Sequence, residues 1–146
     1  MAMEYSYRTK ARKDDNGTIM VSFPDFPGVH TFGEDREDAY AHALDALITG
    51  VEFYVRTKRA IPDPSRGSGR RVSLPATLAA KVALHNLMLS RNVNRAELGR
   101  RLGVHRPQVD RLVDLRHGSR LEQLEAAYGA LGHRLVLHIA PAATKR

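Results

Sequence analysis

The stretch "VSFPDFPGVHTFGEDREDAYAHAL" (residues 21–44) decides the fold of the chain. Within it, the β-rich run that starts at Thr18 ends at two prolines and a glycine. Pro24 cannot donate a hydrogen bond to a β-ladder, and Pro27-Gly28 favours a turn, so the strand should end here. A short strand near "VHTF" should follow, and the acidic residues after it mark a helix start. The stretch therefore predicts a strand, a tight corner, another strand and a helix.

Upstream of this stretch, the sequence predicts a β-hairpin. The runs "EYSYRTKAR" (residues 4–12) and "TIMVSF" (residues 18–23) are rich in β-forming residues and are joined by "KDDNG". Asn16-Gly17 is a strong signal for a tight turn between antiparallel strands. Together with the run near "VHTF", the hairpin gives a sheet of three antiparallel strands.

A helix is expected from Asp35 to about residue 58. Asp35 can cap its N-terminus, and Glu37 and Asp38 in the first turn complement the helix dipole. One wide face of this helix is apolar and suits the covering of a sheet. The residues of this apolar stripe are Tyr40, Leu44, Leu47, Val51 and Tyr54 or Val55.

The opposite face of the same helix is mostly acidic. It carries Asp38, His42, Asp45, Thr49, Glu52 and Arg56. Such a face is either a solvated surface or a docking face for a basic protein partner. In the second interpretation, Asp38, Asp45 and Glu52 would contact that partner.

Charge and composition divide the chain into two parts. Residues 1–62 contain 8 Lys and Arg against 10 Asp and Glu, a net charge of −2, whereas residues 63–146 contain 15 against 6, a net charge of +9. "IPDPSRGSG" (residues 61–69) is rich in proline, serine and glycine and has almost nothing to bury. The predicted organisation is a first domain at 1–62, a linker at 63–71 and a second domain at 72–146. "RRVSL" can add a last strand to the first domain. A basic excess in one part points to a polyanion, most commonly nucleic acid.

The second part has the pattern of a helix-turn-helix inside a small helical bundle. "TLAAKVALHNLMLSR" (residues 77–91) is apolar around most of its circumference, so this helix must be covered on more than one side. After it, Asn94 can cap a helix, Gly103 breaks that helix, and Pro107 falls in the first turn of the next one. A further helix follows.

If "HRPQVDRL" (residues 105–112) is the recognition helix, its N-terminal end and outer face present polar side chains to base edges. These are Arg106, Gln108, Asp110 and Arg111. Arg can bridge guanine O6 and N7, and Gln can pair with adenine. Candidates for phosphate contacts flank this helix in the sequence; they are Asn94, Arg95, Arg116, His117 and Arg120. The alternative is a helical hairpin with an ordinary charged surface.

The segment "RLVLHIA" (residues 134–140) alternates in polarity and predicts a short strand. The basic part offers no evident partner strand. A lone strand leaves N–H and C=O groups unpaired, and the same strand of a second copy can pair with them. We therefore expect a homodimer through this segment, with a tetramer as a further assembly.

Composition argues against several other classes of protein. The chain has no cysteine, which excludes disulfides and thiolate chemistry. Its N-terminus lacks the apolar core of a signal peptide, and no stretch approaches the roughly 18 apolar residues of a membrane span. The seven histidines form no His-Glu-x-x-His motif and no other metal-ligand spacing, and phosphate-loop and serine-elbow motifs are absent. We expect a cytoplasmic protein with no membrane partner, cofactor, metal site or catalytic residue.

Both parts together resemble the HicB antitoxins of bacterial type II toxin–antitoxin modules, in the branch with a C-terminal Xre/Cro-like helix-turn-helix. The resemblance rests on the early hairpin, on residues 21–55 with their proline corner and helix, on the "IPDPS" exit, and on "VSLPATLAAKVALHNLML" and "RAELGRRLGVHRPQVDRL". It implies an α+β fold: a partial RNase H-like antiparallel sheet with one helix, followed by an all-α helix-turn-helix domain with a short terminal strand.

The resemblance also implies two activities. The first domain would bind and block a HicA-type toxin, a small RNA-cleaving protein, and the second would bind the operator of its own operon. Asp25 would then stabilise a turn by accepting hydrogen bonds from nearby amides, because one carboxylate cannot assemble the metal pair of an RNase H site. Two alternatives stay open: a stand-alone transcription regulator whose first domain senses a ligand, and a metal-dependent nuclease.

Overall fold

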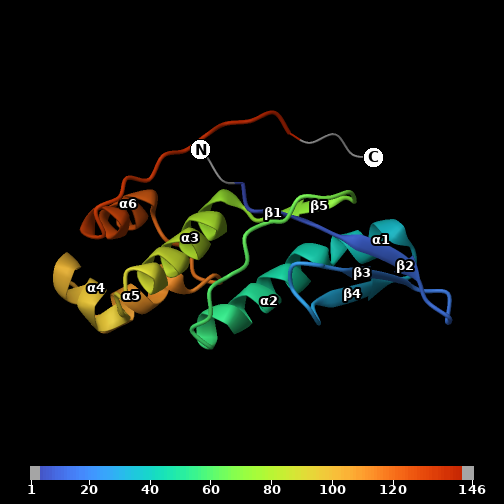
Figure 1. Cartoon of the computed structure of the whole chain (residues 1–146), viewed down its shortest axis with the longest axis horizontal. Coiled ribbons are helices and arrows are strands. Elements are labelled where there is room, and N and C mark those ends of the chain that lie inside the picture. Colours follow the sequence, from blue (N-terminus) through green and yellow to red (C-terminus); the bar gives the residue numbers. More distant parts are fainter. Residues whose placement is uncertain (1–3, 143–146) are drawn as a thin grey trace.

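The computed structural model describes residues 4–142 and has the predicted α+β architecture (Figure 1). A small sheet with two helices forms one end of the molecule, and four helices form the other. The strands are β1 (Ser6–Arg8), β2 (Lys10–Lys13), β3 (Ile19–Ser22), β4 (His30–Gly33) and β5 (Arg71–Ser73). The helices are α1 (Arg36–Ala41), α2 (Ala43–Arg56), α3 (Ala76–Ser90), α4 (Arg95–Leu102), α5 (Arg106–Val113) and α6 (Leu121–Ala130).

The hairpin and the third strand are confirmed. β2, β3 and β4 form an antiparallel sheet in that order, with Met20 opposite Arg12 on one side and Phe32 on the other. Gly17 in the hairpin turn has a φ of +85°, a value that glycine adopts without strain. The proline corner closes when Phe23 N donates to Val29 O (3.2 Å) and Val29 N donates to Phe26 O (3.0 Å).

The first β-rich run of the sequence is divided between two sheets. β1 pairs antiparallel with β5, whereas β2 pairs with β3, and Thr9 lies between them. Thr9 is buried; its Oγ1 donates to Arg70 O (2.6 Å) and shares a hydrogen bond with Tyr40 Oη (2.7 Å). The optional strand at "RRVSL" is therefore present and joins the first part of the chain.

The single helix predicted from Asp35 is divided at His42. His42 N donates to Ala39 O (3.2 Å), a tight i to i−3 bond that ends α1 before α2 begins. The predicted N-cap is present, since Asp38 N donates to Asp35 Oδ1 (2.8 Å). The apolar stripe also packs as predicted, with Leu47 and Val51 fully buried against the sheet.

Helix α3 is shared by two hydrophobic clusters, as its nearly uniform apolar surface predicts. Val82 packs into the cluster of the sheet and α2, whereas Leu84 and Met88 pack into the cluster of α4, α5 and α6. Leu115, which follows α5, also belongs to the first cluster. The two ends of the molecule are consequently joined through a common helix.

The segment between the two parts is held by side chains on both sides. Asn86 of α3 accepts from Ile61 N (2.8 Å) and donates to Ile61 O (3.0 Å), and the His85 ring bonds Arg59 O (2.8 Å). Asp25 accepts from Ser65 N (3.0 Å). We expected Asp25 to accept hydrogen bonds from nearby amides. This was wrong, because its donor, Ser65 N, lies 40 residues away in the sequence. The division at 1–62, 63–71 and 72–146 stays a prediction.

The predicted terminal strand is absent from the single chain. Residues 134–140 have no strand geometry, and Val136, Leu137 and Ile139 are 68%, 59% and 95% exposed. A strand needs a neighbour to satisfy its backbone, and none of the described residues supplies one there. The segment runs away from α6 over the outside of the molecule (Figure 1).

Candidate nucleic-acid and partner interfaces

Helices α4 and α5 are joined by a short turn at Gly103–His105. Gly103 ends α4 with a φ of +68°, and its N–H donates to Arg100 O (3.2 Å). Gly99 allows the turn to approach closely, because a Cβ there would lie 3.1 Å from Val104 O. Leu98 and Val109 are fully buried between the two helices. The outer face of α5 is thereby presented to solvent on a rigid support.

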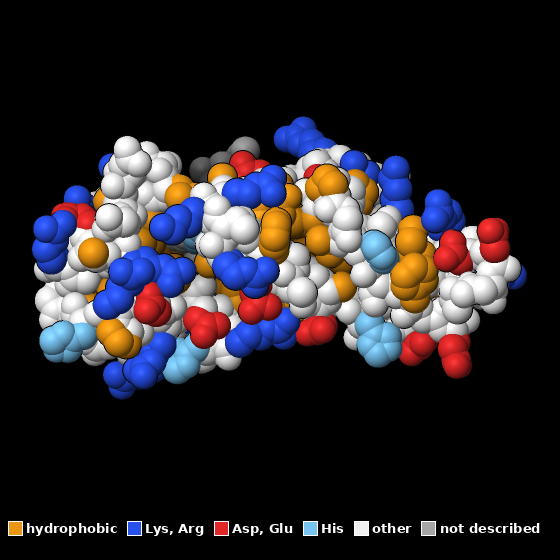
Figure 2. All heavy atoms as spheres, turned by 90° about the horizontal axis from the view of Figure 1, so that it is seen from below, with side chains coloured by type: hydrophobic (Ala, Val, Ile, Leu, Met, Phe, Trp, Pro, Cys, Tyr) orange, Lys and Arg blue, Asp and Glu red, His pale blue; other side chains and the backbone are white. Residues whose placement is uncertain are grey.

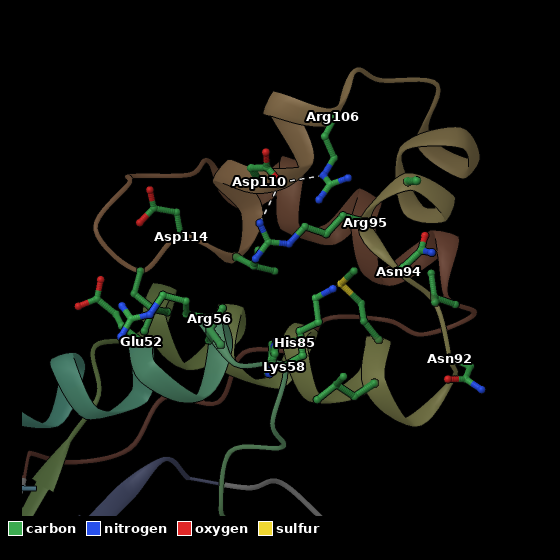
Figure 3. A pocket seen from close by; sticks show the side chains of 17 residues that line it. Glu52, Arg56, Lys58, His85, Asn92, Asn94, Arg95, Arg106, Asp110 and Asp114 are labelled. Carbon is green, nitrogen blue, oxygen red and sulfur yellow. Dashed lines mark hydrogen bonds and ion pairs between the residues drawn. The ribbon is translucent and has the colours of Figure 1, made fainter.

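Asp110 is held by two of the candidate arginines. Arg95 Nη1 donates to its Oδ1 (2.9 Å), and Arg106 Nε donates to the same oxygen (3.1 Å) (Figure 3). The hydrogen bond from Arg95 is the main reason that the pKa of the Asp110 carboxyl lies below its ordinary value. In this arrangement Asp110 orients Arg95 and Arg106, and the charges of Asp110 and Arg95 are already paired with each other.

Two further candidates cap helices. Asn94 Oδ1 accepts from Glu97 N (2.8 Å) at the start of α4, and Gln108 Oε1 accepts from His105 N (2.9 Å) at the start of α5. The Gln108 oxygen is therefore occupied, while its amide nitrogen has no hydrogen bond within residues 4–142.

Arg111 is the charged candidate on α5 that the structure leaves unpaired within residues 4–142. Its side chain is exposed and makes no ion pair within the described part of the chain. Lys and Arg side chains gather over the helical end on the face seen in Figure 2. Arg106 and Arg111 are five residues apart on α5, and both side chains are exposed.

Lys81 is a structural residue that supports the candidate interface, and it was not among the residues expected to have a role. It is fully buried, and its Nζ donates to Arg111 O (2.8 Å), Asp114 O (2.8 Å) and His117 O (2.6 Å). Burial lowers the pKa of Lys81, and the charge of Asp114 partly opposes this effect. Lys81 caps the C-terminal end of α5 with a cation. Its signal in the sequence is a lone charge in an otherwise apolar helix.

Arg116 does not lie with the other candidates for phosphate contacts. Its Nη1 donates to Asp45 Oδ1 (2.9 Å), its Nε to Glu52 Oε1 (3.0 Å) and its Nη2 to Thr49 Oγ1 (3.2 Å), all on α2. The two carboxylates raise the pKa of the guanidinium, Asp45 most strongly. The structure thus joins one candidate for DNA contact to two candidates for partner contact.

The remaining candidates lie apart from the contacts between Arg116 and α2. Asp38 is on α1, where its Oδ2 accepts from Glu34 N (2.9 Å), so it does not share a continuous helix face with Asp45 and Glu52. His117 and Arg120 have exposed side chains after α5, and Arg120 N donates to Gln123 Oε1 (2.9 Å) at the start of α6.

A hollow of about 850 Å³ lies between α2, α3, α4 and α5. Glu52 and Arg56 line it from α2, and Arg95, Arg106 and Asp110 line it from the helical end (Figure 3). Its walls carry both signs of charge.

Within residues 4–142, no three His, Cys, Asp or Glu side chains gather in a way that could hold a metal ion. Asp25 accepts a hydrogen bond from the amide of Ser65 and belongs to no such group. None of the described helices combines the length and the apolar character that crossing a membrane requires.

Comparison with known proteins agrees with this architecture. Residues 6–83, which run from β1 into α3, match the family described as HicB_like antitoxin of bacterial toxin-antitoxin system. Antitoxin HicB of Pseudomonas fluorescens (strain Pf0-1) is 43% identical over 129 residues, which cover 86% of this chain and 88% of that protein. Antitoxin HicB 2 of Photorhabdus laumondii is 40% identical over 137 residues, covering 94% and 98%. Antitoxin HicB of Escherichia coli (strain K12) is 36% identical over 123 residues, covering 83% and 89%.

These relatives extend through both parts of the chain, beyond the residues that the family description matches. Their identity and coverage, together with the match at residues 6–83, show that the chain belongs to the HicB family of toxin–antitoxin antitoxins.

Proposed function

We propose that the chain neutralises a HicA-type, RNA-cleaving toxin with its sheet end and represses its own operon with its helical end. The antitoxin names of its relatives support the first activity, and the charge division supports both. Residues 1–62 carry a net charge of −2 and residues 63–146 carry +9. A toxin that binds RNA should be basic and a DNA operator is acidic, so each part suits one partner.

The proposed reader of DNA is α5, as the second helix of an Xre/Cro-like helix-turn-helix. Arg111 and Arg106 would reach base edges, with Gln108 donating through its free amide. Arg95 and Asp110 would hold Arg106 in place, while Asn94, His117 and Arg120 would contact the phosphate backbone.

A symmetric operator requires a symmetric protein. We propose a homodimer through residues 134–140, whose exposed apolar side chains would be covered by the same segment of the partner copy. Two copies of α5 would then read half-sites about one helical turn apart. A tetramer built from two such dimers would carry two operator-reading surfaces.

The proposed role is one of binding rather than catalysis, carried out in the cytoplasm without a cofactor. On the sheet end, Asp38, Asp45 and Glu52 remain proposed contacts for the toxin. Asp45 and Glu52 are already bonded to Arg116, so a toxin that uses them has to replace that guanidinium.

The observation that carries the proposal is the family membership of a chain whose helical end presents a basic α5. We would express the chain with the short open reading frame beside its gene, purify the complex, and titrate it with the upstream DNA of the operon. We expect co-purification of a small basic protein and binding of the upstream DNA that weakens steeply with salt. Absence of both a co-purifying protein and DNA binding would contradict the proposal.

A ligand-sensing regulator is a second candidate, favoured by the hollow between the two ends of the molecule. Its walls combine His85 and Met88 with the charges of Arg56, Arg95 and Asp110. In that case operator affinity should change with a metabolite extract and should be indifferent to the neighbouring gene product. Thermal-shift screening of the purified chain separates this candidate from the first.

A further inference from the structure

The two edges of the three-stranded sheet differ in charge. β2 forms one edge and carries Lys10, Arg12 and Lys13, all exposed. β4 forms the other edge with the sequence His-Thr-Phe-Gly and has no formally charged residue. Lysine and arginine on an edge strand discourage pairing with other chains, so β2 is protected and β4 is not.

The hydrogen-bond register shows which backbone groups β4 offers. Phe23 N donates to Val29 O, directly opposite it, and bonded pairs alternate along an antiparallel ladder. The next bonded pairs are therefore at Thr31 and Gly33, whereas the N–H and C=O groups of His30 and Phe32 point away from β3. No helix or strand of residues 4–142 lies beyond β4 to receive them (Figure 1).

The edge is held firmly and has exposed apolar side chains beside it. A Cβ on Gly33 would lie 2.2 Å from Ala39 N, so β4 is packed tightly onto α1. Phe32 is 43% exposed and its ring packs edge-on against His30, with 5.5 Å between centroids. Phe53, which is 45% exposed, lines a hollow of about 530 Å³ together with His30. Hydrophobic and histidine side chains are exposed together at the sheet end in Figure 2.

The charge around β4 indicates its partner. Four acidic residues follow β4 within residues 34–38, with Arg36 as the one basic residue among them, whereas the hollow beside Phe53 is lined by Glu52, Arg56 and Arg59. The acidic charge is therefore concentrated at the Gly33 end of the strand. A basic strand would be repelled by β2 and attracted to β4. A second copy of β4 would instead bring its own acidic residues against these.

We infer that β4 is the docking edge for the toxin, which adds an extended basic segment of its own as a fourth strand beside His30–Gly33. This inference rests on the proposed function and names the surface that performs it. Main-chain hydrogen bonds to His30 and Phe32 would supply affinity, and the exposed Phe32 ring and the hollow beside Phe53 would select apolar side chains.

The test compares His30→Pro with His30→Ala. Proline removes only an outward N–H, which an edge strand tolerates, whereas both variants lose the imidazole. We expect His30→Pro to weaken toxin binding at least about tenfold relative to His30→Ala, as measured by calorimetry with the purified toxin. Equal affinities of the two variants would overturn the inference. A wild-type chain that does not bind the toxin would instead overturn the proposed function.

Amide exchange of the wild-type chain supplies a readout that does not depend on folding of a variant. With toxin, the amides of His30 and Phe32 should gain protection, while the outward amides of Ala11 and Lys13 on β2 should not. Protection of the β2 amides, or of neither edge, contradicts the inference. Protection of β4 that rises with protein concentration in the absence of toxin also contradicts it, because the occupant would then be a second copy.

Discussion

Two positively charged side chains hold the end of α5 and the residues after it, and they do so in contrasting ways. Lys81 is buried inside the helical end and donates to three backbone carbonyls, whereas Arg116 is at the surface and binds side chains of α2 at the sheet end. One buried ammonium joins three carbonyls around the end of α5, so Lys81 is a fixed part of the fold. Exposed carboxylates exchange their partners with water and ions. The end of α5 is thus held rigidly by Lys81, whereas the Arg116 contact with α2 is replaceable.

Lys81→Met should have the largest effect on stability. It retains most of the volume but removes three charge-assisted hydrogen bonds in the protein interior, so we expect the free energy of unfolding to fall by about 2–4 kcal/mol in urea titrations. Arg91→Met, at the exposed end of α3, is the control and should cost less than about 0.5 kcal/mol. Equal losses in the two variants would show that Lys81 is not a structural cap.

Arg120 and Arg116 should differ in DNA binding, although both were sequence candidates for phosphate contacts. Arg120→Ala should reduce the slope of log affinity against log salt by about one unit on any DNA sequence. Arg116→Ala should change the slope less, because its guanidinium is engaged by Asp45 and Glu52. A larger change for Arg116 would mean that the bridge to α2 opens when DNA binds.

His85, which bonds Arg59 O between the sheet end and the helical end, should make the stability of the chain depend on pH. Burial lowers its pKa below the ordinary 6.5, partly opposed by the hydrogen bond to Arg59 O, while the charge of Arg95 lowers it further. The unfolded chain therefore takes up the proton first, so the stability is complete above pH 6.5 and is lost as the pH falls through the lowered value. His85→Gln should flatten this part of the stability profile, whereas His117→Gln, which changes an exposed side chain, should flatten it less. An unaltered profile in His85→Gln would refute the assignment.

The smallest effect is expected for the Arg116 bridge itself. A double-mutant cycle of Arg116→Ala and Glu52→Ala should give a coupling free energy of about 0.2–1 kcal/mol that decreases with salt. A coupling as large as the loss in Lys81→Met would remove the contrast between the two cations.

Local signals in the sequence were sufficient for much of the fold. Asn16-Gly17 predicted the hairpin, Asp35 and Asn94 predicted helix starts, and Gly103 predicted the turn before α5, because each of these residues acts within its own few neighbours. The uniform apolar surface of α3 likewise predicted its place in two clusters.

Interactions between distant residues could not be predicted in this way. Arg116 and Asp45 are 71 residues apart, and Asp25 and Ser65 are 40 apart, so only the folded chain brings them together. The charge pattern correctly marked an acidic α2 and a basic helical end. It could not show that one of the basic residues already occupies the acidic face, nor that the helix before it is divided at His42.

The most direct test is one substitution on α5 that should weaken DNA binding by the chain and leave its neutralisation of the toxin unchanged. Arg111→Ala should cost about 1–3 kcal/mol in operator binding and relax the sequence preference, while toxin neutralisation stays at the wild-type level. Affinity for the operator and for random DNA, measured beside RNA cleavage by the toxin, would show this. Equal loss on both DNAs, or a loss of neutralisation in the same variant, would contradict the claim that the two ends of the chain serve two different partners.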